Sequence, residues 1–168
     1  MKPAHAISLA LVAVLLVAAG GDGKRSFGAK LSGILETPAS ISSTGSGRLE
    51  IKVNGAQSSA EYELSYRDLE GSAVLFAHIH LGQPRTGGGV MVFLCSNQGA
   101  PVPTPACPGP AGGTVSGTLT AADLIGPSNQ GVASGEFEEF VKALRNQGAY
   151  VNVHTDLYPP GEIRGNIK

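Results

Sequence analysis

The sequence predicts an all-β domain, an antiparallel β-sandwich or a Greek-key barrel with one amphipathic helix. The 168 residues include 24 glycines and 11 prolines but no tryptophan, a composition typical of short strands joined by many turns. Several segments alternate apolar and polar residues with a period of two, as strands with one buried face do. Only one segment, about residues 135–147, has the period of an amphipathic helix.

The first half of the chain contains three alternating segments. Residues 30–36 alternate loosely, and residues 48–53 alternate strictly. An Asn-Gly corner at residues 54–55 then predicts a hairpin turn, because this dipeptide favours tight turns between strands. The return strand is expected over residues 59–66.

Two nearly continuous apolar runs follow, residues 74–81 and 90–94, and their composition predicts strands near the centre of the sheet. The glycine-rich segment 82–89 between them is expected to be a mobile hairpin tip. It lacks the lysine and the following helix of a phosphate-binding loop. Residues 113–119 predict a further strand, and Thr120 can cap the short turn after it.

The predicted helix over residues 135–147 has apolar residues spaced i, i+3, i+4 and i+7. Ser134 and Gly148 stand at the expected cap positions. The apolar stripe is expected to pack on the sheet. Glu138 and Glu139 then face solvent and form no carboxylate pair for catalysis.

The last part of the chain predicts a hairpin whose two strands each carry a row of polar side chains. In the first strand, residues 149–155, Asn152 and His154 share one face because side chains alternate along a strand. After a Pro-Pro-Gly turn, the second strand places Glu162 and Arg164 on one face.

The first 19 residues have the pattern of a secretory signal peptide, with positively charged Lys2, a short apolar core at residues 7–17 and small residues at the cleavage site. Cleavage would leave residues 20–29 as a flexible N-terminus and residues 30–168 as one β domain. The apolar core is shorter than the about 20 residues of a membrane-spanning helix, which favours cleavage over an uncleaved anchor. We therefore expect a secreted or periplasmic protein with no stable membrane span after cleavage.

Charge narrows the classes of partner. Without Lys2 the chain has 11 basic and 13 acidic residues, a net charge of −2. This balance argues against binding to nucleic acid or to an anionic membrane surface. A protein or envelope component is the expected partner, and the sequence does not specify which.

Cys95 and Cys107 are the only cysteines, and in an exported chain they are expected to pair because the compartment is oxidising. Two free thiols are the alternative. The bond would close a loop with 11 residues between the cysteines, which stabilises a fold by about 2 to 3 kcal/mol in the chain-entropy view. Neither state makes the cysteines catalytic, since their spacing is not that of a Cys-x-x-Cys redox pair.

Three motifs occur in order along the chain: AHIHLG, ACPGPAGGTVSGTLTAADLIGP and YVNVHTDLYPPGEIRG. In their order and spacing they resemble the CHRD domain, a module first described in chordin and found alone in many bacterial exported proteins. The resemblance covers about residues 30–168. It implies a β-rich extracellular module, and we expect a non-enzymatic binding or envelope-associated role.

The histidine pattern is also similar to that of copper/zinc superoxide dismutase, a Greek-key barrel with a His-x-His strand, a later strand histidine and an arginine beyond it. The matching residues here are His78, His80, His154 and Arg164. No further histidine is available to bridge two metals or to build a zinc subsite, which argues against dismutase activity even if the fold is shared.

The three histidines allow two interpretations. Neutral imidazoles suit copper and zinc, and two on one strand plus one from a neighbouring strand can hold a single ion with an open position. Three polar neighbours could then orient the rings: Asn152, Asp156 and Glu162. Arg164 would steer an anion toward the open position of the metal.

The alternative is that the imidazoles are structural and hydrogen-bond to loop carbonyls on a polar face of the sheet. No cofactor is then required. No serine lies in a Gly-x-Ser-x-Gly elbow, and no other catalytic constellation is present. The sequence therefore favours a non-enzymatic module, with a metal-handling or redox protein carrying one copper or zinc ion as the second hypothesis.

Overall fold

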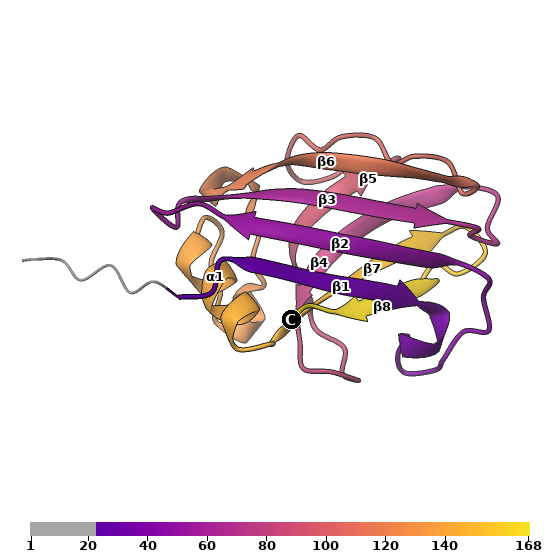
Figure 1. Cartoon of the computed structure of the whole chain (residues 1–168), viewed down its shortest axis with the longest axis horizontal. Helices are drawn as coiled ribbons and strands as arrows, with labels where there is room; N and C mark the ends of the chain where they lie inside the picture. Colours follow the sequence, from indigo (N-terminus) through magenta and orange to yellow (C-terminus); the bar gives the residue numbers. More distant parts are fainter. Residues whose placement is uncertain (1–22) are drawn as a thin grey trace, which may run out of the picture.

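The computed structural model describes residues 23–168, which fold into eight antiparallel strands and one α-helix (Figure 1). The strands are β1 (Ser26–Ser32), β2 (Ser46–Val53), β3 (Ser59–Arg67), β4 (Val74–Leu81), β5 (Gly89–Ser96), β6 (Gly112–Thr120), β7 (Ala149–Thr155) and β8 (Ile163–Asn166). They form one sheet in the order β5-β4-β7-β8-β1-β2-β3-β6, which curves into a nearly closed barrel or sandwich around a single core. The predicted all-β class is confirmed. The predicted signal peptide lies outside the described residues.

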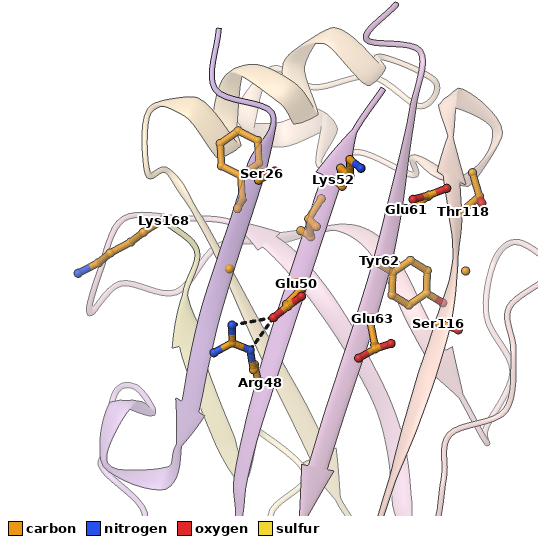
Figure 2. A pocket seen from close by; sticks show the side chains of 14 residues that line it. Ser26, Arg48, Glu50, Lys52, Glu61, Tyr62, Glu63, Ser116, Thr118 and Lys168 are labelled. Atoms are coloured by element: carbon orange, nitrogen blue, oxygen red, sulfur yellow. Dashed lines mark hydrogen bonds and ion pairs between the residues drawn. The ribbon is translucent and has the colours of Figure 1, made fainter. Parts of the chain in front are cut away.

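Strands β1, β2, β3 and β6 form one side of the barrel and alternate as predicted, with apolar residues inward. Their outer face is polar and carries charges of both signs, as the Arg48–Glu50 ion pair in Figure 2 illustrates. The open hollow on this face is lined by such mixed charges and by none of the histidines. It has the composition of an ordinary solvated sheet face.

The first strand begins at Ser26, four residues earlier than expected. Phe27 and Ala29 point into the core and pair with β2, so residues 26–29 belong to a strand rather than to a flexible N-terminus. The strand also ends early, because the chain turns into a short 3₁₀ helix at Gly33–Leu35. Glu36 therefore lies beyond the strand, in a loop.

The prediction that residues 90–94 form a central strand is wrong, because β5 is the last strand at one end of the sheet and pairs only with β4. On the other edge of β5, backbone carbonyls accept hydrogen bonds from a loop and from a side chain. The Met91 carbonyl accepts a hydrogen bond from Ile125 N at 2.9 Å, and the Leu94 carbonyl accepts one from the Tyr62 hydroxyl at 2.6 Å. Near closure of the barrel buries β5 on both sides, which explains its apolar sequence.

The helix α1 (Phe137–Arg145) lies at one end of the barrel (Figure 1), and its apolar stripe packs into the core as predicted. Its caps differ from the prediction. The Ser134 hydroxyl donates to the Leu124 carbonyl at 2.8 Å instead of capping the helix. The helix ends where Gln147 takes a left-handed conformation (φ 55°), one residue before the expected Gly148.

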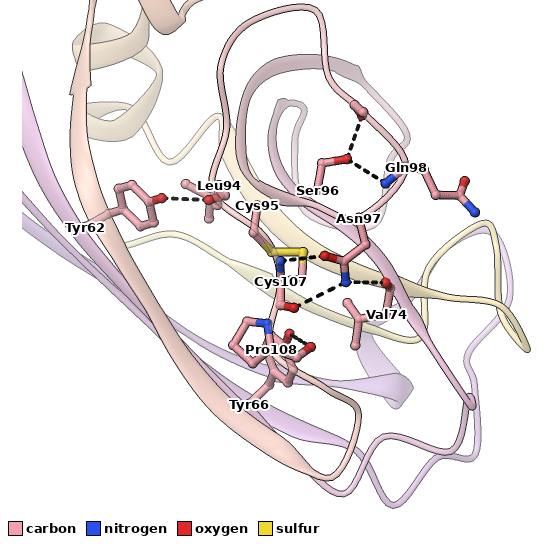
Figure 3. The surroundings of a disulfide bond; sticks show 11 residues. Tyr62, Tyr66, Val74, Leu94, Cys95, Ser96, Asn97, Gln98, Cys107 and Pro108 are labelled. Carbon is pink, nitrogen blue, oxygen red and sulfur yellow. Dashed lines mark hydrogen bonds between the residues drawn. A yellow bond between two sulfur atoms is a disulfide. The ribbon is translucent and has the colours of Figure 1, made fainter.

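The predicted disulfide between Cys95 and Cys107 is present (Figure 3). Asn97 holds the loop that the bond closes, since its side-chain oxygen accepts from Cys107 N at 3.0 Å and its amide donates to the Val74 carbonyl at 2.9 Å. The disulfide thus ties the end of β5 to the loop that leads into β6.

Within residues 23–168, no helix has the length and apolar character that crossing a bilayer requires.

Three loops cover the outer face of β4, β7 and β8: residues 33–45, 82–88 and 156–162. Each contacts a polar side chain of that face, as the hydrogen bonds of His80, His154 and Arg164 show. As a result all seven residues of β7 are buried, including its polar row. The polar face that holds the histidines is therefore buried under loops, unlike the solvent-exposed outer face of β1 to β3.

Candidate functional site

Strand pairing brings the three histidines together. His78 and His80 are two residues apart on β4 and point to the same side, away from the core residues Ala77 and Ile79. The neighbouring strand β7 contributes His154, two residues from the Asn152 position that pairs with His78. One potential ligand nitrogen from each ring lies within 4.8 Å of the other two.

Loop carbonyls fix the orientation of two rings. His80 Nδ1 lies 2.9 Å from the Gly88 carbonyl, and His154 Nδ1 lies 2.8 Å from the Pro159 carbonyl. Because a carbonyl only accepts, both Nδ1 atoms carry the proton, and both Nε2 atoms present a lone pair. His154 Nε2 is buried without a hydrogen-bond partner.

The third ring faces this pair of nitrogens. His78 Nδ1 lies 3.2 Å from His80 Nε2, and the ring centroids of His78 and His154 are 4.7 Å apart. In the metal-free protein this contact is a hydrogen bond between the two rings. The same three nitrogens are the groups that can turn a lone pair toward a shared ion.

Burial keeps the imidazoles neutral. It lowers the pKa of His78 to about 2, with the nearby His154 and His80 lowering it further. Burial is also the main cause that lowers the pKa of His154 to about 4 and the pKa of His80. At neutral pH all three rings are therefore in the deprotonated form that coordination requires.

Aromatic rings pack around the imidazoles. Phe76 stacks on His78 with centroids 4.6 Å apart, and Phe93 meets the same ring edge-on at 4.5 Å. Tyr150 stacks in parallel on His80 at 4.6 Å. These contacts restrict ring rotation and give the cluster apolar walls.

The predicted neighbours of the histidines divide into two groups. Asn152 lies beside the site and interacts with His78 and His80. Asp156 lies elsewhere: its carboxylate accepts hydrogen bonds from the Ser72 hydroxyl and from Ala73 N at the start of β4. It is not positioned to orient an imidazole.

Glu162 also differs from the expectation that it orients a histidine. Its buried carboxylate accepts from the Ser43 hydroxyl, Glu70 N and the Thr155 hydroxyl, each at 2.7 Å. These donors come from separate segments of the chain, so Glu162 holds the loops together at the end of the barrel. It makes no hydrogen bond to an imidazole.

Arg164 is only 1% exposed, so it does not reach out toward an anion in solvent. Its guanidinium donates to the Thr37 hydroxyl and to the Thr86 carbonyl, at 2.8 Å for the latter. It also lies 3.4 Å from the centre of the Tyr150 ring, the ring that stacks on His80. Arg164 thereby joins two covering loops to the histidine site.

Sequence analysis missed Glu36, which is 6% exposed and interacts with Asn152 and Arg164. Only the fold of residues 33–45 over β7 and β8 brings it there, and no local pattern signals that. The backbone of Gly161 (φ 137°) lies against the same two side chains. A Cβ atom there would collide with the Glu36 carboxyl and lie 2.9 Å from the Asn152 amide.

Comparison with known proteins identifies the family. The model of the CHRD domain matches residues 27–167, from the second residue of β1 to one residue before the end of the chain. No curated protein matches the chain. The motifs that carried the resemblance supply the histidine strand β4, the strand β6 and the hairpin of β7 and β8. The chain belongs to the CHRD domain family.

Proposed function

We propose that this CHRD domain binds one metal ion, copper above all, between His78, His80 and His154. The observation that carries the proposal is the convergence of three buried, neutral imidazoles whose ligand nitrogens lie within 4.8 Å of one another. Three nitrogen ligands hold one ion and leave a coordination position open, the arrangement of catalytic and transport sites rather than of closed structural ones.

Hydrogen bonding within the site favours metal binding over a purely structural role. Buried polar atoms in proteins are almost always hydrogen-bonded, yet His154 Nε2 has no partner. The bonds that do exist, from Nδ1 of His80 and His154 to backbone carbonyls, are those that metal-ligating histidines use to fix their tautomer. A purely structural His154 would have both ring nitrogens engaged, as His80 has.

The ligand set favours copper. Imidazole sites bind Cu²⁺ more tightly than Zn²⁺ in the usual order of divalent affinities, and no thiolate or carboxylate belongs to the cluster. With one position open, the ion can accept a small ligand or change oxidation state. We infer a metal-handling or redox role outside the cytoplasm, in line with the predicted signal peptide and with a disulfide typical of oxidising compartments.

A partner-binding module is the weaker candidate. A docking surface usually shows a contiguous apolar patch of several hundred Å². Among the described residues, only three large apolar side chains are exposed: Ile34, Leu35 and Leu157. They offer little surface for a hydrophobic partner.

Calorimetric titration of the purified protein with Cu²⁺ and Zn²⁺ tests the proposal. We expect one ion per chain with a dissociation constant below about 1 µM, which corresponds to about 8 kcal/mol. A His78→Ala, His80→Ala, His154→Ala variant should lose this binding. Asp156→Asn, which alters a carboxyl that contacts none of the histidines, should keep it. Equal binding by the triple variant, or no binding by the wild type, would refute a histidine metal site.

A further inference from the structure

A buried carboxyl lies beside the histidine site and takes no part in holding the three rings. Glu36 comes from the loop of residues 33–45 and is 94% buried. One carboxyl oxygen accepts a hydrogen bond from Thr37 N at 3.3 Å, and the other, Oε1, is buried without a well-formed hydrogen bond. A buried carboxyl with an unsatisfied oxygen is costly, so a structural role alone explains it poorly.

Asn152 connects this carboxyl to the site. Its amide interacts with Glu36, and the same side chain interacts with His78 and His80. Its Oδ1 atom is buried without a well-formed hydrogen bond, like Oε1 of Glu36. Two buried acceptors without a well-formed hydrogen bond, on side chains that interact with each other, indicate that this part of the site is arranged for a proton or a positive charge that can come and go.

The three histidines supply no negative charge to balance a divalent ion. All three ligands are neutral, and the nearest charged side chain joined to the rings is the cation Arg164, through Tyr150. A nearby anion stabilises a buried ion with two positive charges. Asp156 and Glu162 are hydrogen-bonded elsewhere, whereas Glu36 interacts with Asn152, the side chain that reaches His78 and His80.

We propose, on the basis of the metal site proposed above, that Glu36 is the proton-linked counter-charge of that site. Binding of a divalent ion releases the Glu36 proton to solvent and leaves a carboxylate beside Asn152. Binding of a monovalent ion leaves the carboxyl protonated. The site thus exchanges one proton for the second positive charge of the metal, and it selects between oxidation states of copper according to pH.

The protonation of Glu36 is consistent with this exchange. Burial raises the pKa of its carboxyl to about 7, although the Thr37 N–H, Arg164 and Asn152 each lower it. The charged or titratable groups that face it are Arg164 on β8 and Tyr150 on β7. A large fraction of the carboxyl is therefore protonated near neutral pH, and a nearby divalent cation would drive it to ionise.

Proton release can be measured without any activity assay. We would titrate the protein with Zn²⁺ and with Ag⁺, two redox-inert probes of different charge, at pH 6.5 in buffers of different ionisation enthalpy. The dependence of the observed heat on the buffer gives the protons released per ion bound. Wild type should release part of one proton with Zn²⁺ and almost none with Ag⁺.

Three variants locate the proton. Glu36→Gln should abolish the release and, at pH 8, weaken Zn²⁺ binding by about tenfold or more, with a much smaller effect on Ag⁺. Glu36→Asp keeps a carboxyl and should retain part of the release. Glu63→Gln, on the exposed face of β3, is the matched control and should behave as wild type.

The outcomes separate the two proposals. If wild type binds neither ion, the histidine site itself is refuted. If wild type binds Zn²⁺ without releasing a proton, or if Glu36→Gln releases as much as wild type, the site stands and the role of Glu36 is refuted. Because the comparison of Zn²⁺ with Ag⁺ needs only the wild-type protein, the test does not depend on the folding of a variant.

Discussion

Acidification should destabilise the metal-free protein through its buried histidines. The pKa values of His78 and His154 are lowered in the folded state to about 2 and about 4, from a usual value of 6.5. As the pH falls below 6.5, the unfolded chain takes up protons that the folded protein rejects. Stability is therefore lost from pH 6.5 downward, until the pH reaches the folded pKa of each ring.

The size of this effect follows from the pKa values. Between pH 7 and pH 5, each of the two histidines costs about 2 kcal/mol of unfolding free energy. Glu36 acts in the opposite direction, because its raised pKa of about 7 makes the folded state hold a proton that the unfolded state has released. Over the same interval it restores about 2 kcal/mol, so these three groups together leave a net loss of about 2 kcal/mol. His80, whose pKa is also lowered by burial, adds to this loss.

Urea unfolding at pH 7, 6 and 5, followed by the fluorescence of the four tyrosines, measures this balance in the absence of tryptophan. Glu36→Gln removes the compensating group, so its stability should fall by about 2 kcal/mol more than that of wild type over the same interval. Equal losses in wild type and Glu36→Gln would refute the assignment of a protonated carboxyl. A free energy of unfolding that stays constant down to pH 5 in both proteins would refute the neutral, buried state of the histidines.

Three further variants test the surrounding fold by the change in the free energy of unfolding in urea. Replacing both Cys95 and Cys107 by alanine should cost about 2 to 3 kcal/mol through the freed loop, and an unchanged free energy of unfolding would show that the loop is ordered without the bond. Tyr62→Phe removes the buried hydrogen bond to the Leu94 carbonyl and should cost about 1 kcal/mol, whereas a neutral effect would mean that β5 is held by packing alone. Glu162→Gln removes a charged acceptor of several buried hydrogen bonds and should cost about 2 to 4 kcal/mol; a loss below 1 kcal/mol would contradict its role in joining the loops.

Local alternation was enough to predict much of the fold and the core of the site. The period of two assigned several strands of the barrel and placed His78 and His80 on one face, and apolar runs assigned β4 and β5. The HIH and VNVHT motifs also marked the two strands that pair side by side. Convergence of the three rings therefore follows from residue patterns that are visible in the sequence.

Contacts between distant segments were not predictable in this way. An apolar run predicted a central strand for β5, but barrel closure buries an edge strand equally well. The polar row of β7 looked compatible with a solvated face because loop coverage has no period. Glu36 and Arg164 gained their roles only when the loops folded over them.

The most direct test of the proposed metal site is anomalous diffraction at the copper edge from crystals of the copper-loaded protein. We predict one strong peak per chain, about 2 Å from His80 Nε2, His154 Nε2 and His78 Nδ1. A peak only at exposed carboxylates, or no peak between these three nitrogens in a fully loaded crystal, would contradict the three-histidine site.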